Sequence, residues 1–490
     1  MSFSNNSQKD PYVRLPLELL TEIFKFCGER VHDRLALDTL PYKGTTARQF
    51  PWILTHVCRA WRSVVISCPG LWREIIVVLK DDRKYTEDVF QITNLFLERS
   101  ARSSIAVTIV VHKREFDDYD DMDSVDDNEQ DADDGEQDAD DEMNSELDPV
   151  ITLLLAACER WNDLILYSHA DGAIIDALAQ VKGRLPRLAR LGLISIPIEG
   201  HLNNDDDEDL PVRDCFSVVP CLRHATLKQT LSYGKVLLPY GQLTDFDYSY
   251  VDHDMVPEVL KTLTSLESLT LEFWSSESPE IDLLAERQCA LLSLPLVRRF
   301  TVIPGDGAGD NDRFPLLPKL SLPSLVYMKL QTQSEDNHII YSRICSFISR
   351  SHCHLTSLQI KNQWGVLDDA ALEVLRLTPD LTELKLFALD VTETFLQQLT
   401  RLQDTGTLSL FPAIIPGLES FRLHIKGSLN ETLLLQLIES RFSSGPQPEL
   451  FCTLKYAKVS HPKEFSLLFK QGIAGLKARG MEGEAFKKNW

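Results

Sequence analysis

Two short segments carry residue types that could bind a metal ion. His352-Cys353-His354 places three potential ligands next to one another, and Gly305–Asp312 alternates glycines with carboxylates. Neighbouring residues of an extended chain point to opposite sides, so one ion cannot easily take all three side chains of the first segment. The second lacks the bidentate glutamate that an EF-hand calcium loop needs, because Leu317 stands at that position. We interpret both as turns and predict no metal and no cofactor.

Other catalytic signatures are missing from the sequence. There is no phosphate-binding loop of the form Gly-x-x-x-x-Gly-Lys-Ser/Thr and no Gly-x-Ser-x-Gly nucleophile elbow. We therefore expect a protein that is not an enzyme, and an unrecognised catalytic site is the weakest of three functional hypotheses.

The cysteines and the hydropathy pattern bear on the compartment. None of the 10 cysteines forms a Cys-x-x-Cys pair, and most stand in apolar stretches, which is typical of free core cysteines in a reducing compartment. No run of apolar residues is long enough for a membrane span, and Met1–Asp10 lacks the apolar core of a signal peptide. These features predict a cytoplasmic or nuclear protein without a membrane association.

The net charge of −23 is concentrated in one segment. Glu115–Asp148 contains 19 acidic residues and no Lys or Arg, so the remaining chain is nearly neutral. We expect this acidic insert, 115–148, to be disordered. It would act either as an expanded solvated loop or as a binding segment for a basic partner. No concentrated basic patch is visible in the sequence, so we do not expect a nucleic-acid partner.

The residues that remain as functional candidates are apolar and must be positioned by short helices. Pro16 suits the first turn of a helix and Glu18 favours the positive end of the helix dipole. The apolar stripe of this helix consists of Leu19, Leu20, Ile23, Phe24 and Cys27. A second helix over Thr55–Val65 repeats the spacing with Val57, Cys58, Trp61, Val64 and Val65. A third short segment follows Pro69.

Such a module, residues 14–73, is marginal on its own. A chain of about 60 residues buries only ~60% of its unfolded surface. It gains stability by laying an apolar face against a partner or against the next domain.

These residues resemble the F-box. The family pattern is a Leu-Pro-x-Glu-Leu-Leu-x-x-Ile-Phe helix, a Val-Cys-Arg-x-Trp-Arg helix and a Pro-x-Leu-Trp segment, which here correspond to Leu15–Phe24, Val57–Arg62 and Pro69–Trp72. The spacer before Val57 is longer than in a compact F-box, and we interpret it as an inserted loop. The arrangement is similar to that of F-box proteins of mushroom-forming fungi, in which Pro-Trp commonly precedes the second helix.

The resemblance implies a function. F-box proteins bind a Skp-type adaptor, which links them to a cullin and a RING subunit, while their C-terminal domain captures a substrate protein for ubiquitination. The residues that would contact the adaptor or shape that surface are Leu15, Pro16, Leu19, Leu20, Ile23, Phe24, Val57, Cys58 and Trp61. The alternative for Ile23 and Trp61 is that they form only the core of the module.

A repeat occupies the chain after the helical module. The pattern Leu-x-x-apolar-x-apolar recurs, and copies between Leu266 and Leu381 are spaced by about 26–30 residues, enough for one strand and one helix. The copies begin at Trp161, Leu188, Leu243, Leu266, Leu296, Leu325, Leu355, Leu381 and Leu418. Helical patterns lie between them at Thr86–Arg99, Leu147–Arg160, Asp282–Leu292, Ile339–Ser349, Asp368–Leu375 and Glu431–Glu439.

This part of the chain resembles the leucine-rich repeat family, although the Asn or Cys position after each strand is not regularly filled. The resemblance implies an α/β fold: a polar tail at 1–13, the F-box-like module at 14–73, an irregular solenoid at 74–460 and a C-terminal tail at 461–490. A globular α/β domain with coincidental leucine patterns is the alternative. The leading functional hypothesis is a substrate receptor of a Skp–cullin–F-box ubiquitin ligase. The second is a repeat scaffold that binds proteins without a ligase.

Overall fold

The structure is a computed structural model that describes fourteen segments of the chain. These are residues 16–32, 50–80, 87–112, 149–169, 172–196, 212–228, 235–250, 255–273, 291–304, 316–332, 337–362, 364–400, 414–442 and 454–487. The chain divides into two compact units: unit 1 is Met1–Leu222 with Gln229–Pro239, and unit 2 is Arg223–Lys228 with Tyr240–Trp490. The predicted acidic insert 115–148 and the tail 1–13 lie outside the described residues.

Unit 1 begins with short helices and continues with a parallel sheet. The helical module contains α1 (Leu17–His32), α2 (Trp52–Thr55), α3 (Arg59–Ser67) and the 3-10 helix η3 (Pro69–Trp72). The sheet is ordered β1 (Glu74–Lys80), β2 (Ile105–His112), β3 (Trp161–His169) and β4 (Arg190–Ile196), and adjacent strands are parallel. The connections contain α4 (Glu87–Arg99), α5 (Pro149–Ala156), η4 (Cys158–Arg160), α6 (Gly172–Ala177) and η5 (Leu178–Val181). A short pair, β5 (Val212–Arg213) and β7 (Lys235–Val236), completes the unit.

Unit 2 is a longer sheet with the same pattern. Its strands are β6 (His224–Lys228), β8 (Asp245–Tyr250), β9 (Ser268–Phe273), β11 (Arg299–Pro304), β13 (Tyr327–Thr332), β14 (Ser357–Asn362), β16 (Glu383–Ala388), β18 (Ser420–Ile425), β19 (Tyr456–His461) and β20 (Glu482–Lys487), in this order across the sheet. Every adjacent pair is parallel.

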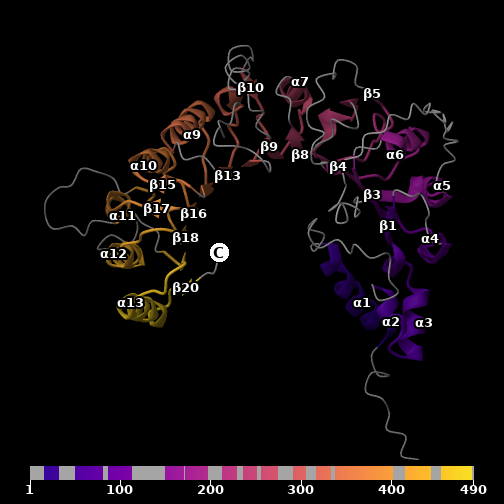
Figure 1. The fold of residues 1–490 in the computed structure, drawn as a ribbon, viewed down its shortest axis with the longest axis horizontal. Helices are drawn as coiled ribbons and strands as arrows, with labels where there is room; N and C mark the ends of the chain where they lie inside the picture. Colours follow the sequence, from indigo (N-terminus) through magenta and orange to yellow (C-terminus); the bar gives the residue numbers. More distant parts are fainter. Residues whose placement is uncertain are drawn as a thin grey trace, which may run out of the picture. The chain divides into compact units, whose positions relative to one another are not determined.

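Helices connect these strands on one side of the sheet. They are η8 (Tyr240–Gln242), α7 (Met255–Thr262), η9 (Leu317–Lys319), α9 (Asn337–Ser351), α10 (Asp369–Arg376), α11 (Glu393–Leu399), α12 (Glu431–Phe442) and α13 (Leu467–Ala478). Two short parallel pairs lie between helices and strands: β10 (Leu292–Ser293) with β12 (Leu320–Ser321), and β15 (Val366–Leu367) with β17 (Asp390–Val391). Figure 1 shows α9 to α13 along one side of the strands of unit 2.

The two faces of this sheet differ because side chains alternate along a strand. In β13 the residues Met328, Leu330 and Thr332 are buried toward the helices, while Tyr327 and Lys329 are only half-buried on the opposite face. The strands β14 and β16 repeat the same alternation. One face therefore forms the continuous core with the helices, and the other presents mostly polar side chains.

Three arginines connect successive strand–helix units. Arg441, at the end of α12, is buried and donates to the carbonyl oxygens of Leu399 at 2.7 and 2.9 Å, Ile414 at 2.6 Å and Ile415 at 2.6 Å. Arg350, in α9, donates to the carbonyls of Leu317 and Leu320 in the preceding turn. Arg160 donates to the carbonyls of Leu97 and Ser103 and to the hydroxyl of Ser100. Each guanidinium thus donates to backbone carbonyls of an adjacent strand–helix unit.

The predicted α/β class is confirmed, with parallel strands and intervening helices. All nine predicted repeat copies contain strands, namely β3, β4, β8, β9, β11, β13, β14, β16 and β18. Five of the predicted helices correspond to α4, α5, α9, α10 and α12, whereas Asp282–Leu292 lies almost wholly outside the described residues.

The prediction of a C-terminal tail at 461–490 needs correction. This part of the chain contains α13 and the strand β20, which pairs with β19 from Glu482 to Lys487. Phe469, Ile473 and Leu476 are buried in α13, so this segment continues the core.

Candidate protein-binding site

The first helix of the module begins where the sequence predicts. Pro16 directly precedes α1, and its carbonyl accepts the first helical hydrogen bond from the amide of Leu20 at 3.1 Å. Glu18 lies in the first turn. Proline loses nothing here, since the first amides of a helix have no intrahelical acceptor. Leu15 lies outside the described residues.

One side of α1 packs into the core of the module. Leu20 and Phe24, one turn apart, are buried, and the Phe24 ring lies 4.8 Å from the ring of Trp61 in α3. Tilted aromatic pairs at this separation contribute about 0.5–1.5 kcal/mol beyond the area that they bury. Leu20 and Phe24 therefore shape the module from within, and Trp61 is partly buried as their neighbour.

The second predicted helix begins later than expected. Thr55–Val65 was predicted as one helix, but α2 ends at Thr55 and α3 starts at Arg59. Cys58 is the extended N-cap residue of α3, and its sulfur accepts from the amide of Trp61 at 3.4 Å. Arg62 donates through Nε to the carbonyl of Thr55 at 2.8 Å, which satisfies the end of α2. As a result Val57 lies in the turn rather than on the apolar side of a helix.

An aromatic cluster attaches the module to the sheet of unit 1. Trp72 is fully buried, and its indole donates to the carbonyl of Val65 at 2.8 Å. Its ring lies 5.3 Å from that of Trp52 and 5.1 Å from that of Phe96 in α4. The Arg99 guanidinium lies 4.3 Å from the centre of the Trp72 ring, and burial lowers the pKa of Arg99. The sequence did not indicate Phe96 and Arg99, because the pairing spans two helices.

The remaining apolar residues of α1 face solvent. Leu19 is 52% exposed and Ile23 is 47% exposed, and Val57 in the turn before α3 is 57% exposed. Pro16, Leu19 and Ile23 recur at intervals of three and four, so they follow one side of the helix. Phe26, at the next interval, is also exposed. Contiguous exposed apolar surface of this kind is typical of protein-binding sites. We name Pro16, Leu19, Ile23 and Phe26 the α1 stripe.

The predicted site residues thus differ in their exposure to solvent. Pro16, Leu19, Ile23, Val57 and Cys58 are exposed. Leu20 and Phe24 are buried, and Trp61 is intermediate. The sequence did not single out the exposed Phe26, Ile53 and Ile66. Extending the spacing from Leu19 and Ile23 by three residues would have found Phe26. Ile53 and Ile66 carry no comparable signal.

Neither a cluster of possible metal ligands nor a thiol with a lowered pKa stands out among the residues that follow. The described residues contain no group of three or more His, Cys, Asp or Glu side chains that could hold a metal ion. In the segment after α9, His354 instead donates through Nδ1 to the carboxylate of Asp380 at 2.8 Å. Burial raises the pKa of the thiols of Cys158, Cys345 and Cys353, and raises that of Cys215 to about 11. These thiols stay protonated at neutral pH.

A scan against models of protein families finds no match, and a search of curated proteins finds no similar sequence. Among the described helices, none is long and apolar enough to cross a membrane.

Proposed function

We propose that the chain is a substrate receptor of a Skp–cullin–F-box ubiquitin ligase, with an F-box at residues 14–73 and a leucine-rich-repeat-like solenoid as its substrate-binding part. The observation that carries this proposal is the exposure of Leu19, Ile23 and Val57 beside a buried core of Leu20, Phe24 and Trp72. If the module served only to stabilise its own unit, we would expect these aliphatic side chains to be buried, because exposed apolar patches are typical of interaction sites.

The buried and exposed sides of α1 support the same proposal. Leu20 and Phe24 face inward and hold the helix to α3, while Leu19 and Ile23, which directly precede them, face outward. A partner helix or groove could therefore cover the α1 stripe without disturbing the core. The Trp72–Arg99 contact joins the other end of the module to α4, so the helical module that carries the stripe is attached to unit 1.

The array supplies the second binding function. The helix-free face of the sheet in unit 2 is polar, and receptor repeats of parallel strands use such faces to hold proteins. By this proposal, the adaptor binds the helical module and the substrate binds the sheet. Ubiquitin transfer is then carried out by other subunits, which agrees with the lack of catalytic motifs in the sequence.

The direct test is binding of the purified full chain to a purified fungal Skp-type adaptor, followed by co-purification with a cullin. We expect a one-to-one complex with the wild type, and loss of the complex when Leu19 and Ile23 are both changed to aspartate. Absence of binding by folded wild-type protein would refute the ligase proposal. The chain would then act as a repeat scaffold, whose polar sheet face still provides a protein-binding surface.

A further inference from the structure

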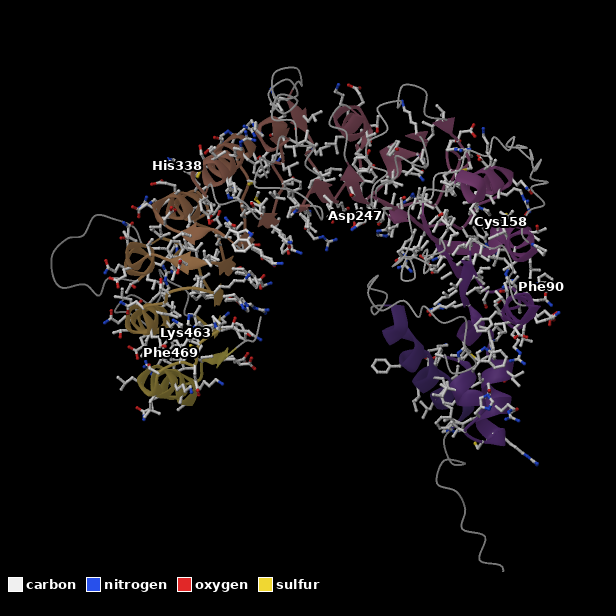
Figure 2. The ribbon with its side chains drawn as sticks, viewed as in Figure 1. Phe90, Cys158, Asp247, His338, Lys463 and Phe469 are labelled. Atoms are coloured by element: carbon white, nitrogen blue, oxygen red, sulfur yellow. The ribbon has the colours of Figure 1, made fainter. Side chains whose placement is uncertain are left out.

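The helix-free face of unit 2 has an uneven distribution of charge. On the strands β8 and β9 its charged residues are Asp245, Asp247 and Glu272. On the strands β13 to β19 the basic residues are Lys329, Lys361, Lys385, Arg422 and Lys458, and the one carboxylate is Glu383. Figure 2 shows Asp247 on the strand side of unit 2 and His338 on its helix side.

The register of the strands arranges most of these cations in a line. Lys329 is paired with Gln359, Gln359 with Lys385, Lys385 with Arg422, and Arg422 with Lys458. We name these five residues the central row. Neighbouring parallel strands are about 4.8 Å apart, so the row extends over roughly 19 Å. Three successive strands, β16, β18 and β19, each contribute a cation to it.

Such a row is unfavourable unless something compensates for it, because like charges directly opposite each other repel. Part of the compensation is internal. Lys385 pairs with Glu383 at 2.8 Å, and Lys458 pairs with Glu484 of β20 at 3.3 Å. Burial alone would raise the pKa of Glu383, but hydrogen bonds from Lys385 and Ser357, together with the charges of Lys385 and Arg422, hold it below its usual value.

The middle of the row has unused donors. The Arg422 guanidinium lies 5.1 Å from the centre of the Tyr456 ring. Its Nε is buried without a hydrogen-bond acceptor, so its terminal N–H groups are the ones that could meet a partner. Within the described part of the chain, Lys329 and the Gln359 amide likewise make no side-chain hydrogen bond or ion pair. An arginine that is fixed by stacking and has open N–H groups is suited to a carboxylate, which can accept two parallel hydrogen bonds.

Aromatic residues lie on both sides of the central row. One neighbouring row contains Tyr327 and Tyr456, and the other contains Phe387 and His424, whose rings stack at 4.2 Å. His424 is buried and its Nδ1 shares a hydrogen bond with the Ser460 hydroxyl, so this stack is fixed. The face therefore offers cations in the centre and aromatic contacts on the flanks.

We propose that the helix-free face over β13 to β19 binds an extended acidic segment of a partner protein, with carboxylates on Arg422 and Lys329 and apolar side chains on the flanking aromatic residues. The proposal rests on the proposed function only in that the segment would belong to the captured substrate. A nucleic-acid duplex fits less well, because it carries a charge every ~1.7 Å. For a single strand, whose charges are ~3.4 Å apart, the carboxylate of Glu383 interrupts the face. An extended peptide advances ~3.3 Å per residue, so about six residues cover the row.

The test uses the full chain without any adaptor, so its result does not depend on the helical module. Fluorescence anisotropy would measure binding of a labelled peptide of about ten residues that alternates Glu with Tyr or Ser. The test variant is Lys329→Gln with Lys385→Gln and Arg422→Gln. The matched control is Lys261→Gln with Lys470→Gln and Lys477→Gln, which removes the same charge from the helices α7 and α13.

We expect the wild type and the control variant to bind the Glu peptide, and the test variant to bind roughly 3- to 150-fold more weakly, since it loses three surface ion pairs. Charge reversal with Lys329→Glu and Arg422→Glu should transfer binding to the corresponding Lys peptide. The proposal is overturned if the wild type does not bind the Glu peptide, or if the test and control variants bind it with equal affinity. It is also overturned if a single-stranded oligonucleotide displaces the labelled peptide at a lower concentration than the unlabelled Glu peptide does.

Discussion

The exposed aliphatic residues of the helical module allow a quantitative prediction of adaptor binding. Leu19, Ile23 and Val57 each keep about half of their surface in solvent. Fully burying an aliphatic side chain of this size contributes about 1.5–3 kcal/mol, so covering the exposed half contributes ~0.7–1.5 kcal/mol for each residue. Changing all three to alanine should therefore remove about 2–4 kcal/mol of binding free energy. At 1.4 kcal/mol per tenfold change, this weakens the adaptor complex roughly 30- to 700-fold.

Isothermal titration calorimetry of the full chain with a Skp-type adaptor would measure this loss. The control is Leu467→Ala with Leu468→Ala, which makes the same kind of change at two exposed leucines of α13 and should leave the affinity unaltered. Thermal unfolding should change little in either variant, because exposed substitutions shift stability by about 0.5 kcal/mol or less. A folded triple variant that binds within threefold of the wild type would refute the assignment of Leu19, Ile23 and Val57 to the adaptor surface.

Three further predictions concern the array. Changing Arg441 to methionine leaves several buried carbonyl oxygens without donors, so we expect the free energy of unfolding in urea to fall by about 3–5 kcal/mol. A decrease below about 1 kcal/mol would contradict the role of Arg441 as the donor to these carbonyls. Changing Gly483 to alanine would place a Cβ against the carbonyl oxygen of Ala457 in β19 and should detach β20, which hydrogen exchange of the Glu482–Lys487 amides would reveal. Burial and the charge of Glu272 raise the pKa of Asp247 despite the opposing charge of Lys228, so the ionised Asp247 destabilises the fold at neutral pH. Asp247→Asn should therefore stabilise the protein at pH 7, with a gain that shrinks as the pH falls toward the ordinary value of 3.8; a gain that grows on acidification would reverse the assigned sign.

The repeating part of the fold was largely accessible from the sequence. The spacing of leucines marks strands because the same alternation that buries Leu358 and Ile360 toward the helices leaves Gln359 on the open face. The strands β1, β2, β6, β19 and β20 were missed as copies of the pattern. In β19 the small Ala457 stands where the predicted copies have a larger apolar side chain, and in β20 the glycine at 483 fits against the backbone of its neighbour.

The helical module was predictable in composition but not in detail. The apolar spacing identified α1, yet it could not separate Leu20, which is buried, from Leu19, which is exposed. That distinction depends on where α3 packs, through the Phe24–Trp61 contact. The sequence also did not indicate that α3 starts only at Arg59. Cysteine is an unusual N-cap residue, and the hydrogen bond from the Trp61 amide to the Cys58 sulfur is known only from the structure.

The in-register parallel pairing has a consequence for how this chain can diversify. Each strand–helix unit contributes one side chain to the central row, at a position fixed by its neighbours. Duplication or loss of a whole unit would lengthen or shorten the binding surface by about 5 Å without moving the residues on either side. A single substitution at the equivalent of Lys329 or Gln359 would change one contact residue of the proposed binding surface without changing the core. Partner preference in this architecture can thus change one repeat at a time.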